Sequence, residues 1–216
     1  MPETAIDSIA IATALLICLM GVLYCWKIGR RIANPTIATW IIFEIGAWMS
    51  SVTYFSSSDH SAIASITNVT DDAAITAILI ALAFKHWGEK IPFSQNHRLC
   101  LGIAVAAFIL WVFTRMSWVG VLGFQMVMSV AYIPTFENLW RYEPGLGPTP
   151  APAPEPAEVW GVNILSAALG VAIAIAKHDY VAMLYPLRAC ILCVVVLLLI
   201  LRWRRKSALH CATVKA

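Results

Sequence analysis

The stretch VAMLYPLRACILCVVVLLLIL, residues 181–201, contains a single charged side chain, Arg188. About 20 predominantly apolar residues in helical conformation are needed to cross the hydrocarbon core of a bilayer. A basic run, RWRRK at 202–206, follows at once and belongs in water or among anionic lipid headgroups. The stretch therefore predicts a membrane-spanning helix that ends at its basic flank.

The composition of the whole chain gives the same indication. Of its 216 residues, 60% are hydrophobic and 12% are charged, and the mean hydropathy is +0.77. An ordinary soluble domain is about half apolar and about a quarter charged. This excess of apolar residues predicts the lipid bilayer as a partner. The formal net charge of +3 is small, so we expect no nucleic acid as a partner.

Seven apolar segments are long enough to span a membrane. They are Ile6–Trp26, Thr36–Phe55, Ala62–Phe84, Leu99–Phe113, Trp118–Leu139, Val159–Ala176 and Val181–Leu201. Outside these segments, all basic residues except Arg115 and Lys177 fall on one side of the alternating topology. Because basic residues concentrate in cytoplasmic loops, this predicts an external N-terminus and a cytoplasmic C-terminus, in the plasma (inner) membrane.

An internal repeat accompanies the seven segments. Similar short sequences recur in the same order: VLY at 22–24 with VAY at 130–132, TW at 39–40 with VW at 159–160, and HW at 86–87 with RW at 202–203. This order predicts two three-helix units, residues 1–95 and 117–216, joined by a linker helix at 96–116. The odd helix makes the units parallel, so we expect the solute site between them near mid-membrane. A Pro-rich stretch at 144–158 is predicted to form a cytoplasmic spacer.

The sequence YIPT at 132–135, followed by Trp140 and Arg141, is similar to the Pro-Gln end of a PQ-loop helix, with Thr135 in place of the glutamine. In layout the chain resembles the SWEET and PQ-loop transporters, including their relatives that carry nicotinamide riboside and other vitamins. The resemblance implies a 3+1+3 helical fold and transport of a small solute. It also implies that the solute sits between the third and seventh spans.

Ionisable residues within a span are costly and mark functional sites. The third segment carries Asn68, Asp71 and Asp72, and the seventh carries Arg188. When the tryptophans that end these two segments are aligned, Asp72 and Arg188 fall at the same depth. We hypothesise that they form the central solute site. Two alternatives are a pair that only neutralises charge for insertion, and an acidic cap of a helix that begins near Thr70.

Glu44 lies in the middle of the second segment, with Trp40 and Trp48 four residues to either side and therefore on the same helix face. A carboxyl flanked by indoles is suited to carry a proton that is coupled to transport. The alternative is a protonated carboxyl that hydrogen-bonds a neighbouring helix, for which Gln125 is the candidate partner.

Aromatic and amide side chains also point to a solute site. Trp160 and Asn163 lie one turn apart at the start of the sixth segment, and Tyr132 and Tyr185 supply hydroxyl groups. Such a set suits a ring-shaped solute. The alternative for Trp160 is an ordinary position at the membrane interface.

These patterns predict a transporter or facilitator for a sugar, nucleoside, vitamin or amino-acid-like solute, with or without proton coupling. The same seven-helix layout also resembles the receptor for ER-retention signals, so a sorting receptor is a second hypothesis. An intramembrane lipid enzyme is a third, although the sequence offers neither a nucleophile–base pair nor a metal-ligand motif. We expect no enzyme activity and no cofactor, and association into a homo-oligomer stays open.

Overall fold

The computed structural model describes residues 2–33, 35–57, 60–91, 93, 95–141 and 155–215, and every regular element among them is a helix. The helices are α1 (Glu3–Gly29), α2 (Ile37–Phe55), α3 (Ile66–Lys85), α4 (Gln95–Thr114), α5 (Ser117–Ala131), α6 (Ile133–Arg141), α7 (Ala157–Ala176) and α8 (Tyr180–Lys215). Of the predicted Pro-rich spacer, residues 144–154 lie outside the described residues.

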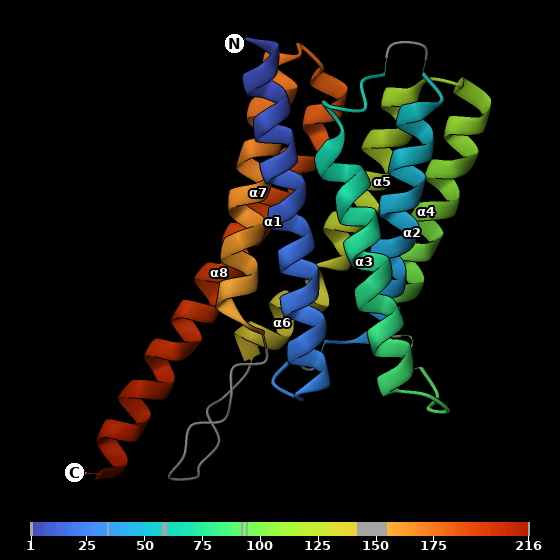
Figure 1. Ribbon diagram of the computed structural model, residues 1–216. Helices are drawn as coiled ribbons and strands as arrows, with labels where there is room; N and C mark the ends of the chain where they lie inside the picture. The colour runs from blue at the N-terminus through green and yellow to red at the C-terminus, as the bar shows by residue number, and fades with distance from the viewer. Residues whose placement is uncertain are drawn as a thin grey trace.

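Six helical segments of the described chain are long and apolar enough to cross a membrane. They comprise α1, α3, α4, α7, the first part of α8, and a segment from Ser117 to Glu137 that includes α5. This indicates an integral membrane protein. The predicted second span, α2, is not among the six, because Glu44 and several Ser, Thr and Trp residues lower its hydropathy. Nevertheless α2 runs alongside the others within the bundle (Figure 1).

Two of the predicted helices differ most from the helices of the structure. The single helix predicted at Trp118–Leu139 is interrupted at Tyr132, between α5 and α6. The cause is Pro134, which has no N–H to donate to the carbonyl of Val130 and whose ring collides with it. The helix predicted to end at Leu201 continues to Lys215, because the residues that follow include no glycine or proline and several strong helix formers.

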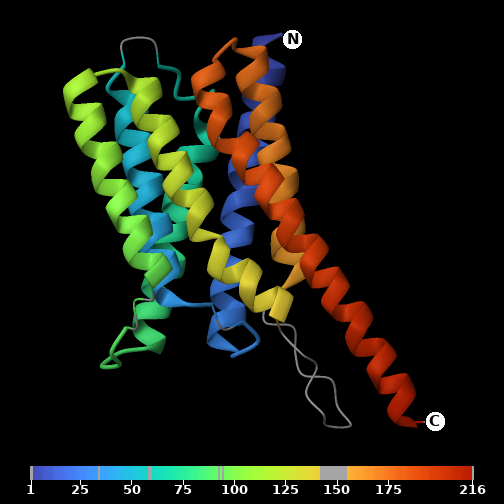
Figure 2. The same cartoon turned by 180° about the vertical axis from the view of Figure 1, so that it is seen from behind.

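The helices in the first half of the chain contact one another in a pattern similar to that of the helices in the second half. Helix α3 packs against α1 and α2, and α8 packs against α7 and against both α5 and α6. Helix α1 also contacts α7, α2 also contacts α5, and α4 packs on α5 and α2. The N- and C-termini lie at opposite ends of the bundle (Figures 1 and 2).

The outward surface of the bundle is strongly apolar. Leu15 and Val22 of α1 are 65% and 67% exposed, and Phe113 of α4 is 82% exposed. Apolar surface of this extent is stable only against lipid or another protein. The outer faces of α1 and α4 are therefore suited to the hydrocarbon of a bilayer.

Gly170 allows α7 to approach α3 and α8 closely. A Cβ atom at this position would lie 2.1 Å from Thr67 Oγ1 and 3.1 Å from Pro186 Cβ. Threonine has few rotamers in a helix and the proline ring is rigid, so neither neighbour can yield easily. Gly161, on the same helix, has no neighbouring atom within 4 Å of such a Cβ.

We therefore expect Gly170→Ala to destabilise the protein by about 1–3 kcal/mol through overpacking. Gly161→Ala should instead stabilise it by about 0.5–1 kcal/mol, because alanine favours the helix over glycine. Thermal unfolding in detergent would measure both effects. Equal melting temperatures for the two variants would contradict this account of the α3–α7–α8 contact.

Candidate functional site

A mostly apolar cavity lies inside the bundle, and its walls come from α1, α2, α3, α5, α7, α8 and the α5–α6 junction. The lining residues are Met20, Tyr24, Trp40, Phe43, Asp71, Ile75, Met128, Tyr132, Val159, Trp160, Asn163 and Arg188. Helix α4 contributes none of them. The cavity measures about 30 Å³, about a tenth of the smallest pockets for small ligands, which measure roughly 300 Å³. A ring-shaped solute needs several times this space, so its binding requires the walls to move apart.

Residues of the same type and spacing from the two halves of the chain line the cavity. Met20 and Tyr24 of α1 are matched by Met128 and Tyr132, which have the same spacing and also line the cavity. Trp40, at the start of α2, is matched by Trp160 at the start of α7. The two halves of the chain thus contribute equivalent positions to one site. The tyrosines and tryptophans were visible in the repeat, whereas the methionine pair was missed although its spacing to the tyrosines signals it.

Arg188 is a cation on the wall of this cavity. Its Nε donates to Gln125 Oε1 at 2.6 Å, and its guanidinium carbon lies 5.1 Å from the centre of the Tyr185 ring. Gln125 in turn donates to Ser50 Oγ at 2.8 Å. Within the described part of the chain, Arg188 forms no ion pair, and its buried Nη1 has no hydrogen-bond partner. The guanidinium therefore retains a donor for a ligand.

Asp71, and not Asp72, shares the cavity with Arg188. The Tyr185 hydroxyl donates to Asp71 Oδ2 at 2.7 Å, whereas Asp72 accepts a hydrogen bond from Ser51 of α2. The predicted Asp72–Arg188 pair is therefore wrong in this structure. Successive residues on a helix point about 100° apart, so one carboxylate faces α8 and the next faces α2. The acidic-cap alternative is also wrong, because α3 begins at Ile66 and has no acidic residue in its first turn.

Two other predicted site residues lie behind the cavity wall. Glu44 accepts hydrogen bonds from Trp48 Nε1 at 2.8 Å and from Thr76 Oγ1 at 2.5 Å. Gln125, the suggested partner of Glu44, bonds Ser50 and Arg188 instead. Asn68 is buried and lines a smaller pocket beside Tyr185. Of the predicted set, the structure brings six residues together around the cavity: Trp40, Asp71, Tyr132, Trp160, Asn163 and Arg188.

Glu155 contacts two residues of the cavity wall, Tyr24 and Trp160, and was not singled out from the sequence. It is 7% exposed, although it belongs to the Pro-rich stretch that was predicted to be a spacer. Its Oε2 accepts hydrogen bonds from the Tyr24 hydroxyl at 2.7 Å and from Trp160 Nε1 at 3.3 Å. Burial raises the pKa of Glu155 to about 7, and the two hydrogen bonds partly oppose this rise.

A second tyrosine–carboxylate contact lies at the opposite end of the bundle. The Tyr54 hydroxyl, near the end of α2, donates to Asp179 in the turn between α7 and α8. Asp179 also caps α8, because its Oδ1 accepts from the backbone N–H of Ala182 at 2.8 Å. Both ends of the bundle are thus held by a tyrosine from the first half of the chain and a carboxylate from the second.

Comparison with models of known protein families, with characterised proteins and with solved structures finds no match for this chain. Its own features define a helical membrane protein with an aromatic-walled cavity between the two halves of the chain, into which three polar or charged side chains point. Among the described residues, no group of three histidine, cysteine, aspartate or glutamate side chains is placed to hold a metal ion.

Proposed function

We propose that the chain is a transporter or facilitator for a small polar organic solute, such as a sugar, a nucleoside, a vitamin or an amino-acid-like compound. The observation that carries the proposal is the cavity, to which both halves of the chain contribute residues at equivalent positions. Parallel repeats of this kind place a solute site at their interface. Five aromatic rings suit a planar solute, and Asp71, Asn163 and Arg188 supply polar contacts.

The proposed architecture has seven spans in a 3+1+3 arrangement, with α2 as the seventh span and α4 as the linker. The packing supports it, because α3 contacts both α1 and α2, and α8 contacts both α5 and α7. The contacts between units, α1 with α7 and α2 with α5, are also equivalent under the repeat. Termini at opposite ends of the bundle agree with an odd number of spans (Figure 1). From the distribution of basic residues we propose an external N-terminus, a cytoplasmic C-terminus and a plasma-membrane location.

The two tyrosine–carboxylate contacts give the proposed transport a physical basis. Tyr24–Glu155 and Tyr54–Asp179 each join the two halves of the chain, one contact at each end of the bundle. Breaking one contact while the other stays intact would admit solute from one side at a time. The small volume of the cavity agrees with a conformation in which both ends are held together.

A sorting receptor for peptide carboxylates is the second hypothesis. Such a receptor needs several basic groups in its site, whereas Arg188 is the sole basic residue lining the described cavity. This favours transport over peptide recognition. The absence of enzyme activity remains an expectation.

Counterflow in proteoliposomes tests the proposal. Vesicles loaded with unlabelled glucose, uridine, thiamine or histidine are diluted into the same labelled compound, and protein-free vesicles serve as the control. We expect transient accumulation of one of these labelled solutes. Stabilisation of the folded protein by a panel compound without any counterflow would favour a receptor and contradict transport.

A further inference from the structure

The five aromatic side chains of the cavity form a continuous series across the two halves of the chain. Ring centroids are 5.2 Å apart for Tyr24 and Trp40, 5.7 Å for Trp40 and Phe43, 4.8 Å for Phe43 and Tyr132, and 6.0 Å for Tyr132 and Trp160. These separations are typical of interacting aromatic pairs. We call this series the aromatic collar.

Glu155 joins the two free ends of the collar. The same carboxylate oxygen accepts a hydrogen bond from Tyr24, the first ring of the series, and from Trp160, the last. The collar and Glu155 together make a closed series of contacts, and its members Tyr24 and Trp160 lie near the end of α1 and the start of α7. We call Glu155 the clasp, because it contacts both ends of the collar. A change in this residue can therefore release both ends.

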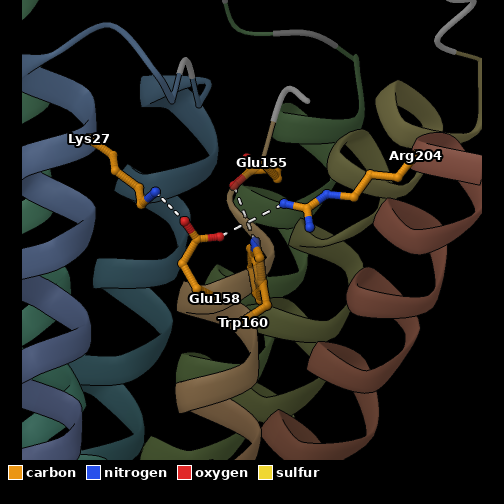
Figure 3. A network of polar contacts seen from close by, with 5 residues as sticks. All are labelled: Lys27, Glu155, Glu158, Trp160 and Arg204. Atoms are coloured by element: carbon orange, nitrogen blue, oxygen red, sulfur yellow. Dashed lines mark hydrogen bonds and ion pairs between the residues drawn. The ribbon is translucent and has the colours of Figure 1, made fainter. Parts of the chain in front are cut away.

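The charged groups near the clasp are engaged with one another. Glu158 accepts a hydrogen bond from Lys27 of α1 and lies 4.0 Å from Arg204 of α8. Figure 3 shows Glu158 between these two basic residues, while Glu155 points to the Trp160 indole. In the part of the chain described here, Glu155 itself has no basic partner and rests on two neutral donors.

We propose that Glu155 is a proton-binding site, and that loss of its proton releases the aromatic collar and opens this end of the cavity. The inference rests on the proposed transport function and assigns its proton-coupling residue. The protonated carboxyl accepts hydrogen bonds from Tyr24 and Trp160 without placing a charge in the protein interior, so it holds both side chains in place. Loss of the proton leaves a buried charge without a basic partner, which is costly away from water. The carboxylate therefore moves toward water and lets the two halves of the chain separate at the collar.

The buried position of Glu155 makes the exchange of this proton effective near neutral pH. Its pKa is about 7 in the folded protein and has an ordinary value of 4.5. As the pH rises from about 4.5 to about 7, the unfolded chain loses this proton before the folded chain does. Glu155 therefore contributes stability at low pH that is lost as the pH rises through 7.

The first test compares thermal unfolding of the wild type with that of Glu155→Gln at pH 5.5 and pH 8.5. Glutamine resembles the protonated side chain at every pH. We expect the melting temperature of the variant, relative to the wild type, to rise by about 4 °C or more between the two pH values. Glu89→Gln is the matched control, because it neutralises an exposed carboxylate that bonds only its neighbour His86 among the contacts described, away from the cavity.

The second test measures opening directly. Asn163→Cys is labelled with a membrane-impermeant cationic thiol reagent from the collar side at pH 8.5, and mass spectrometry assigns the label to position 163. We expect Glu155→Gln to lower the labelling rate about tenfold and Glu89→Gln to leave it unchanged. All variants are compared at one pH, so ionisation of the thiol does not enter the ratio.

A temperature difference that is constant with pH, or equal labelling rates with and without Glu155→Gln, overturns the proposal. Neither test uses a solute, so both keep their meaning if counterflow detects none and the transport function fails. Conversely, if counterflow is detected but either test shows no effect of Glu155→Gln, the proton-binding role of Glu155 is contradicted and the transport function is not.

Discussion

Replacing Arg188 with glutamine is expected to lower the rate of solute counterflow at least tenfold. The substitution removes the cation and the unpartnered Nη1 donor from the cavity wall. A hydrogen bond to a charged group contributes about 1.5–3 kcal/mol, which corresponds to a factor of about 10–150 in affinity. The measurement is the initial rate of counterflow for the panel compound that exchanges in the wild type.

Arg202→Gln is the matched control for this experiment. Arg202 lies on the same helix but outside the cavity, with its guanidinium stacked 3.5 Å from the centre of the Trp140 ring. Its replacement should change counterflow by less than about twofold, because the side chain does not line the cavity. Equal rates for the Arg188→Gln variant and the wild type would show that Arg188 has a purely structural role.

Asp71→Asn is expected to have the second largest effect, and Asp72→Asn a small one. Asparagine at position 71 can still accept the Tyr185 hydrogen bond, so the wall keeps its shape but loses a negative charge. We expect the apparent affinity for the solute to fall about tenfold or more, because contacts with charged groups contribute about 1.5–3 kcal/mol. The concentration dependence of counterflow measures it.

Asp72→Asn is the matched control for Asp71→Asn, because the two aspartates are neighbours on α3. Asparagine at position 72 can still accept from Ser51, on the side of α3 that faces α2 and away from the cavity. If Asp72→Asn impairs counterflow and Asp71→Asn does not, this result would support the pairing of Asp72 with Arg188 that the sequence predicts. It would contradict the geometry described here.

The sequence predicts much of the fold because lipid imposes a simple rule on composition. Each of the seven apolar segments contains a helix, since buried backbone groups in lipid must be hydrogen-bonded within the segment. Pro134 is sufficient to predict the interruption at Tyr132. In the sequence it was interpreted only as part of a motif similar to the end of a PQ-loop helix. The extension of α8 could not be read from hydropathy, because a basic helix in water carries no apolar signal.

The short sequences that recur in the two halves of the chain predict part of the site. Tyr132, Trp160 and Trp40 recur at equivalent points of the two units, and all three line the cavity. The choice between Asp71 and Asp72 depends on the rotation of α3 about its axis, which is set by its packing against α1, α2, α7 and α8. Glu155 was missed for a different reason: its burial depends on the approach of α1 to α7, and its local sequence is that of a solvated spacer.

The central claim is that one cavity, shared by the two units, is reached from both sides of the membrane. Its most direct test is cysteine accessibility at Met20 and Met128, which occupy equivalent positions on the cavity wall and are 3% and 2% exposed. Met20→Cys and Met128→Cys are treated with an impermeant thiol reagent in right-side-out and inside-out vesicles. Ile42→Cys, buried but outside the cavity, is the control. We expect both cavity cysteines to react from both sides and the control from neither. Reaction from one side only would contradict a transport path and favour a receptor pocket.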